Sequence, residues 1–234
     1  MKRVGIMGGT FDPIHSGHLE AASAAESALK LTSLLVIPSN VPPHRPPPLA
    51  SSYHRFAMVS LAVAGHSAWN ASDLELRDSA RSVTSATLQK LHALGYAPAE
   101  LFFIIGADAF AEIMSWVDYP AILGYAHFAV VARPGHPIAD VPQRLPALAS
   151  RMVRPPLESS RRDPLIVLLD APTSDVSSTA IRERRAKGES VSGLVPDLVR
   201  QHIEQHELYS SPAAQRLAGD STSAAAAGRL HGKE

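Results

Sequence analysis

Short apolar segments alternate with helical segments along most of this chain, and this alternation limits the folds open to it more than any other feature. Repeated strand and helix signals of this kind are typical of an α/β fold whose sheet is mainly parallel and flanked by helices. The predicted strands cover residues 4–7, 34–38, 101–105, 128–132 and 165–169, with one more ending at residues 73–76, and the predicted helices cover residues 17–30, 53–64, 84–94, 176–187 and 196–206.

One large domain accounts for nearly all of the chain in this interpretation. The 234 residues, of which 45% are hydrophobic, suffice to bury one ample core. We predict a domain over residues 1–209. Residues 210–234 are rich in Ala, Ser and Gly and are expected to form a disordered tail.

Charge and composition exclude several partners and locations. Lys plus Arg and Asp plus Glu both number 22, so no overall field would attract nucleic acid or an anionic membrane. No apolar run reaches membrane-spanning length, and residues 4–7 are too short for the core of a signal peptide. The chain has no Cys, which excludes disulfides, thiolate metal sites and a Cys nucleophile. We therefore expect a cytoplasmic protein; the sequence does not indicate its oligomeric state.

The segment GGTFDPIHSGH, residues 8–18, carries the strongest chemical signal. Gly8 and Gly9 permit a tight turn and a close approach of backbone amides to a ligand. The helix that begins near Gly17 presents unpaired N–H groups and a dipole that favour an anion. His15 and His18 would both face this anion and donate hydrogen bonds to it. The segment predicts a phosphate site at the carboxyl edge of the sheet.

Two simpler interpretations of the same segment remain open. The histidines could bind a metal ion, but zinc requires a third protein ligand and Asp12 is the one other candidate nearby. A plain turn with incidental histidines is also possible. The segment matches neither the G-x-G-x-x-G dinucleotide fingerprint nor a P-loop.

Two segments downstream could serve the same site. DVSSTAIRER, residues 175–184, would place hydroxyls, amides and a guanidinium at a second helix start, although alone it predicts an ordinary N-cap. VPPHRPPP, residues 41–48, follows a strand and could form a rigid rim of the site, a stiff polyproline linker or a ligand for a proline-binding module.

Two single residues also have alternative interpretations. Asp108 follows a strand and Gly106, where a carboxylate can accept ribose hydroxyls or cap the next helix. Trp116 is either a core residue or a flat surface for a ligand ring.

The motifs taken together resemble a known family. Residues 8–18 look like the H-x-G-H signature of nucleotidyltransferases, and residues 175–184 look like their Ser-x-Thr-x-x-Arg signature. SNVPPHRP at 39–46, GADAF at 106–110, Trp116 and ARPG at 132–135 narrow the resemblance to the bacterial nicotinate-nucleotide adenylyltransferase family. The resemblance covers about residues 3–209.

The resemblance implies a Rossmann-like nucleotidyltransferase fold, ATP and a pyridine mononucleotide as substrates, and pyrophosphate as by-product. It also implies magnesium, which we expect to arrive with ATP, and we expect no metal-ligating residues. Roles in catalysis are implied for His15, His18 and Arg182. ATP contacts are implied for Gly8, Gly9, Thr10, Phe11, His15, His18, Gly106, Asp108, Ser178, Thr179 and Arg182. Mononucleotide contacts are implied for Asn40, His44, Arg45, Val83, Thr84, Trp116 and Arg133.

The chain departs from the family near the expected pyridine pocket. It has Arg-Ser-Val-Thr at residues 81–84 where the family usually has Pro-Ser-Tyr-Thr. The backbone amides of Val83 and Thr84 would still favour a carboxylate over a carboxamide, because residues 82–87 contain no Asp or Glu. Glu75 and Asp78 are near enough in sequence to change this. We therefore predict a preference for nicotinate mononucleotide.

Two other functions remain open at this point. The chain could be another H-x-G-H enzyme, such as a pantetheine-phosphate adenylyltransferase or a cytidylyltransferase, or a catalytically silent nucleotide-binding protein. Its length, Trp116 and residues 41–48 disfavour the first, and the two intact phosphate signatures disfavour the second.

Overall fold

A seven-stranded parallel sheet forms the centre of the computed structural model, which describes residues 2–40, 47–77, 81–157 and 163–211. The strand order is β3-β2-β1-β4-β5-β7-β6. The strands are β1 (Val4–Gly9), β2 (Ser33–Pro38), β3 (Trp69–Ala71), β4 (Leu101–Gly106), β5 (His127–Val131), β6 (Met152–Val153) and β7 (Ile166–Leu169). The predicted α/β fold with a mainly parallel sheet is confirmed.

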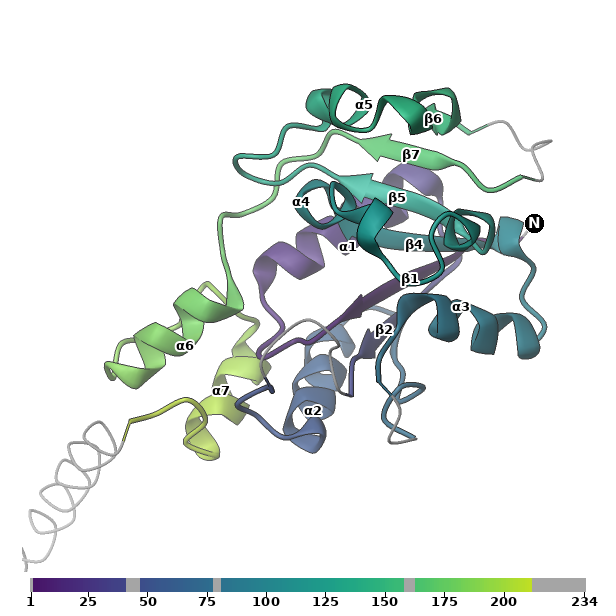
Figure 1. Cartoon of the computed structure of the whole chain (residues 1–234). Helices are drawn as coiled ribbons and strands as arrows, with labels where there is room; N and C mark the ends of the chain where they lie inside the picture. The colour runs from purple at the N-terminus through teal and green to yellow at the C-terminus, as the bar shows by residue number, and fades with distance from the viewer. Residues whose placement is uncertain (1, 41–46, 78–80, 158–162, 212–234) are drawn as a thin grey trace, which may run out of the picture.

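Helices cover both faces of this sheet (Figure 1). The α-helices are α1 (Ser16–Leu29), α2 (Ser52–Val63), α3 (Thr84–Ala93), α4 (Ala107–Phe110), α5 (Val141–Arg144), α6 (Ser178–Ala186) and α7 (Asp197–Gln205). The 3₁₀ helices are η1 (Pro98–Glu100), η2 (Ile113–Ser115), η3 (Ala121–Gly124), η4 (Ile138–Asp140) and η5 (Pro146–Arg151). Among the described residues, none of these helices has the length and apolar character needed to cross a bilayer.

The core lies in two layers, one on each face of the sheet. Apolar residues of α1, α2, α6 and α7 pack on one face, and those of α3, α4, α5 and most of the 3₁₀ helices pack on the other. The strands β4, β5 and β7 are apolar along almost their whole length because they are covered on both sides. Strand β1 has β2 as its neighbour on one side and β4 as its neighbour on the other, so the strand order reverses at β1. Ligands of open α/β sheets bind at such a reversal.

Two details of the edges differ from the sequence prediction. The prediction of a strand that ends at residues 73–76 is wrong. Strand β3 occupies Trp69–Ala71, and residues 73–76 form a turn closed by a 2.8 Å hydrogen bond from the Leu76 N–H to the Asp73 carbonyl. The physical reason is that Trp69 is buried where it pairs with Leu34 of β2, and pairing with β2 ends at Ala71. The two-residue strand β6 was not predicted. From residue 212 onward the predicted tail lies outside the described residues.

Candidate functional site

A cleft of about 610 Å³ opens at the carboxyl edge of the sheet, where β1 and β4 end side by side. Its walls come from the loop after β1, the first turn of α1, the residues after β4, and the starts of α3 and α6. Segments far apart in the sequence therefore meet at the position expected for a ligand in this fold. Of the residues singled out from the sequence, the cleft is lined by Gly8, Gly9, Thr10, Phe11, His18, Val83, Thr84, Gly106, Asp108, Trp116, Arg133 and Ser178.

The remaining candidates lie elsewhere. Four of them are not in the cleft wall, namely His15, Asn40, Thr179 and Arg182. His44 and Arg45 lie outside the described residues.

The loop after β1 is shaped by a close approach between a glycine and an aromatic ring. A Cβ on Gly9 would lie 2.9 Å from the ring of Phe11, which is too close for any side chain. Phe11 has a positive φ of 49° and is 2% exposed, so burial of its ring stabilises an otherwise unfavourable backbone. Its ring meets that of His18 edge-on, with centroids 5.0 Å apart. Phe11 thus fixes both the loop and His18.

His15 and His18 form a stacked pair at the start of α1. Their ring centroids are 3.7 Å apart, and the His15 backbone N–H donates to His18 Nδ1 at 3.3 Å. Because His18 Nδ1 is an acceptor, neutral His18 carries its proton on Nε2. His18 lines the cleft, so it can offer a donor to a ligand there.

His15 has a different environment. It is 2% exposed, and burial, aided by the charge of Arg133, lowers its pKa to about 4, although Glu20 opposes this shift. It is therefore neutral near pH 7. We expected both histidines to face the same anion, but only His18 is in the cleft wall. His15 is placed to position His18.

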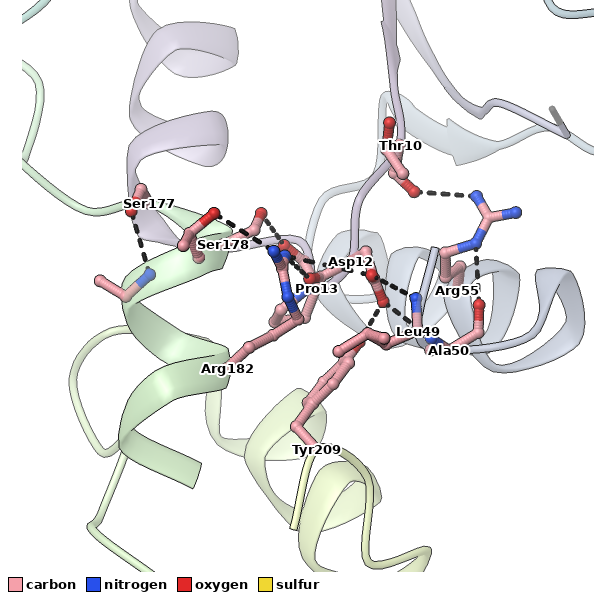
Figure 2. A network of polar contacts seen from close by, with 12 residues as sticks. Thr10, Asp12, Pro13, Leu49, Ala50, Arg55, Ser177, Ser178, Arg182 and Tyr209 are labelled. Carbon is pink, nitrogen blue, oxygen red and sulfur yellow. Dashed lines mark hydrogen bonds and ion pairs between the residues drawn. The ribbon is translucent and has the colours of Figure 1, made fainter. Parts of the chain in front are cut away.

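Asp12 is the centre of a network that holds the loop after β1 (Figure 2). Its buried carboxylate accepts hydrogen bonds from the backbone N–H groups of Leu49 (2.8 Å) and Ala50 (3.0 Å) and from the Tyr209 hydroxyl (2.8 Å). Burial, followed by the charge of Asp12, raises the pKa of Tyr209, so its hydroxyl stays a donor. The network joins the first loop to the segment before α2 and to the end of α7.

Arg55 also holds the loop after β1. This α2 residue is 1% exposed, and its guanidinium donates to the carbonyl oxygens of Thr10 (2.8 Å), Ser39 (2.6 Å) and Ala50 (3.3 Å). Burial lowers its pKa, whereas the charge of Asp12 raises it. No local sequence pattern marks Arg55 as a buried residue, because a single Arg within a helical pattern is usually exposed.

The second phosphate signature packs directly against the first. The Ser177 hydroxyl caps α6, the Ser178 hydroxyl donates to the carbonyl of Pro13 at 2.9 Å, and Arg182 donates to the carbonyl of Asp12 at 2.8 Å (Figure 2). A second Arg182 nitrogen donates to the Thr179 hydroxyl at 3.2 Å. The starts of α1 and α6 are thereby joined, and both reach the cleft through His18 and Ser178.

The residues after β4 form the opposite wall. A Cβ on Gly106 would collide with the carboxylate of Asp108 and approach the Arg133 side chain to 2.9 Å, so these two side chains can lie over the strand end only because residue 106 is glycine. Arg133 lines the cleft together with His18, and its charge adds to the effect of burial in lowering the pKa of His15. Trp116 meets Phe103 edge-on at 6.2 Å and contributes to the cleft wall.

An acidic residue closes the end of the cleft near α3. The Thr87 hydroxyl donates to the buried Glu75 carboxylate at 2.5 Å, and both residues line the cleft beside Val83 and Thr84. The Asn40 backbone N–H donates to the Ser82 hydroxyl at 2.7 Å, which attaches the segment before α3 to the end of β2. Residues 82–87 themselves contain no carboxylate, but Glu75 brings one to this pocket.

Comparison with known proteins identifies the class to which this fold and site belong. The family model of cytidylyltransferase-like proteins matches residues 6–184, a span that runs from β1 to α6 and includes both phosphate signatures. The cleft is therefore that of a nucleotidyltransferase.

Relatives narrow the class to a family. A protein from Cronobacter sakazakii, named "Probable nicotinate-nucleotide adenylyltransferase", is 42% identical over 207 residues, which are 86% of this chain and 93% of that protein. A Desulfitobacterium hafniense protein of the same name is 40% identical, over 89% of this chain and 96% of its own length. This chain belongs to the nicotinate-nucleotide adenylyltransferase family.

Solved structures agree on the fold. The Plasmodium falciparum nicotinic acid mononucleotide adenylyltransferase complexed with NaAD superimposes with a TM-score of 0.68 at 19% sequence identity, covering 89% of this chain and 98% of that one. The same Plasmodium enzyme complexed with APC gives a TM-score of 0.66.

Proposed function

We propose that this chain transfers AMP from ATP to the 5′-phosphate of nicotinate mononucleotide, producing deamido-NAD and pyrophosphate as a step of NAD biosynthesis. The observation that carries the proposal is the joining of two phosphate signatures at one cleft: His18 at the start of α1 and Ser178 at the start of α6 line the same wall. The names of the relatives supply the acceptor class.

The reaction requires positioning and charge stabilisation rather than a protein nucleophile. An oxygen of the mononucleotide phosphate attacks the α-phosphorus of ATP, the new P–O bond forms, and the bond to pyrophosphate breaks. His18 Nε2–H, the backbone amides at residues 8–11 and the amides at the start of α6 are donors for the charge on the phosphates. Their positions are set before substrate arrives, because Asp12, Arg55 and Phe11 hold the loop.

We assign the two ends of the cleft to the two substrates. Asp108 would accept hydroxyls of the ATP ribose, and Arg182 would act on the outer phosphates of ATP. Trp116 would stack on the pyridine ring, and Arg133 would bind the mononucleotide phosphate. The presence of Arg133 and His18 in the same cleft lining supports a position where the two phosphates meet.

Magnesium is proposed to arrive with ATP. ATP-using nucleotidyltransferases generally need a divalent cation, which neutralises phosphate charge during transfer. Asp108, Glu112 and Glu75 line the cleft, yet across the described residues no group of three carboxylates converges there to hold such an ion. The phosphates and water would therefore supply most of its ligands.

We propose that backbone N–H groups select nicotinate mononucleotide over nicotinamide mononucleotide. The first amides of α3, beginning at Thr84, have no acceptor within the helix and lie at its positive end. The Glu75 carboxylate alone would favour an amide N–H, but it already accepts the Thr87 hydroxyl at 2.5 Å. Through this bond Glu75 positions the start of α3, and we propose that the backbone donors outweigh its remaining acceptor sites at the pyridine substituent.

Product identification tests the proposal. The purified chain is incubated with ATP and magnesium and, in separate reactions, with nicotinate mononucleotide, nicotinamide mononucleotide or phosphopantetheine. We expect deamido-NAD from nicotinate mononucleotide as the main product, and no deamido-NAD when magnesium is omitted. Exclusive formation of dephospho-coenzyme A, or no product from any acceptor, would refute the proposal. A cytoplasmic location and a single domain over residues 1–209 remain predictions from the sequence.

A further inference from the structure

Three histidines outside the cleft lie close together where α2 packs against α7. They are His54 of α2, His202 of α7 and His206 directly after α7. One ring nitrogen from each lies within 4.8 Å of the others, and none of the three residues lines the cleft. The cluster is therefore separate from the substrate site.

The backbone on both sides of this cluster is well fixed. The Ser51 hydroxyl caps α2 by accepting the N–H of His54 at 3.3 Å. On α7, Val199 and Ile203 are 0% exposed and anchor the helix in the core, while His202 and His206 lie one turn apart on the same side. Two packed helices thus present all three imidazoles.

The spacing of the nitrogens matches that of metal ligands. His54 Nδ1 and His202 Nε2 share a hydrogen bond of 3.1 Å, and the ring centroid of His206 lies 4.8 Å from that of His54 and 4.4 Å from that of His202. A tetrahedral zinc ion with Zn–N bonds near 2.05 Å separates its ligand nitrogens by about 3.3 Å. One nitrogen of His206 lies within 4.8 Å of the other two, so a movement of its ring toward them would complete such a set.

Burial, followed by the charges of His206 and His54, lowers the pKa of His202. The neutral ring is the form that binds a metal ion.

We propose that His54, His202 and His206 form a binding site for one divalent transition-metal ion of the zinc class, with water as the fourth ligand. Three imidazoles suit zinc, nickel or copper, whereas magnesium prefers oxygen ligands and is bound poorly. The bound ion would stabilise the packing of α2 against α7, because its neighbours support the substrate loop. His54 precedes Arg55, which holds the carbonyls of Thr10 and Ser39, and Tyr209, which follows His206 by three residues, holds Asp12.

Metal titration of the full chain, prepared without a polyhistidine tag and stripped with a chelator, tests the site. Zinc binding is followed by calorimetry, and cobalt is used as a spectroscopic probe, since tetrahedral cobalt absorbs strongly in the visible range. We expect one ion per chain, a rise in melting temperature on addition of zinc, and no such rise on addition of magnesium.

Matched variants locate the ion. His206→Asn changes the exposed member of the cluster. It should lower the zinc affinity by about 10-fold to 100-fold. The far-ultraviolet circular dichroism spectrum should stay unchanged. His54→Asn tests the partner helix. His66→Asn, at a histidine outside the cluster, should bind zinc like the unmodified chain, and so should His18→Ala, which removes the other close histidine pair.

Two results would overturn the proposal. One is the absence of stoichiometric zinc binding by the stripped chain at micromolar concentrations. The other is binding that survives in both His206→Asn and His54→Asn, or that is lost in His18→Ala, since either would place the ion elsewhere. The adenylyltransferase assay is not needed for any of these readouts, so the inference stands or fails independently of the proposed function.

Discussion

The Tyr209 hydroxyl donates a 2.8 Å hydrogen bond to the carboxylate of Asp12, and this bond joins the turn after the last helix to the first loop of the substrate cleft. Tyr209→Phe removes it and leaves Asp12 with its two backbone donors. A hydrogen bond to a charged group contributes about 1.5–3 kcal/mol, so we expect the free energy of unfolding to fall by roughly that amount. Urea denaturation measures it. Tyr53→Phe, at a residue that is 86% exposed, is the control, and equal stability of the two variants would contradict the role of the bond.

His18→Ala tests the role of the histidine that faces the cleft. The change removes the Nε2–H donor at the start of α1, and loss of one such donor lowers kcat by roughly 100-fold or more, about 2.7 kcal/mol. Steady-state kinetics measure the loss, and thermal unfolding checks that the fold is kept. Turnover close to that of the unmodified chain would show that the charge is stabilised by other groups.

Arg182→Ala tests which substrate the second signature serves. Because we place Arg182 at the outer phosphates of ATP, the KM for ATP should rise more than the KM for the mononucleotide. Its bond to the Asp12 carbonyl is also lost, so some decrease in stability is expected. Arg184→Ala, at a neighbouring arginine that bonds to the Ser190 carbonyl, is the control. An increase confined to the mononucleotide KM would reverse the assignment of the two ends.

Acid should destabilise the fold through two buried histidines. Burial is the main cause that lowers the pKa values of His15 and His127 to about 4, whereas a histidine in the unfolded chain has a pKa of about 6.5. As the pH falls from about 6.5 to about 4, the unfolded chain binds protons that the folded chain does not, so the free energy of unfolding falls by a few kcal/mol in total. Above about pH 6.5 both states are neutral and the effect vanishes.

Urea midpoints across this pH range measure the effect. His127→Asn is the matched variant, because the Asn oxygen can replace Nδ1 as acceptor of the Leu165 N–H, now bonded at 3.0 Å. Its unfolding free energy should depend less on pH than that of the unmodified chain. A midpoint that stays constant down to about pH 4.5 would mean that the two histidines titrate normally.

Much of the fold could be predicted from the sequence, because long apolar strands and Ala-rich helices carry strong local signals. The strand at residues 101–105 and the helix at 84–94 match the structure within one residue. The edge of the sheet could not be placed in the same way. Only a buried Trp69 distinguishes the three-residue strand β3, and its pairing with Leu34 is a tertiary contact that no local pattern contains.

The site shows the same division between local and long-range information. Glycines and helix starts have sequence signals, and twelve of the singled-out residues line the cleft. The contacts that support the first loop have no local sequence signal. Arg55 is 45 residues from its partner Thr10, and Tyr209 is 197 residues from its partner Asp12. His54 and His202, which are 148 residues apart in sequence, also come together only through the packing of α2 against α7.

The acceptor preference tests the central claim most directly. The kcat/KM values for nicotinate and nicotinamide mononucleotide are measured with the unmodified chain at saturating ATP and magnesium, with the dinucleotide product identified in each case. We predict that the nicotinate form is preferred by a factor of at least about 10, roughly 1.4 kcal/mol, because the amides at the start of α3 offer donors to a carboxylate. Equal values or a preference for the amide would contradict selection of the acid by the α3 amides, and no dinucleotide from either acceptor would contradict the proposed function.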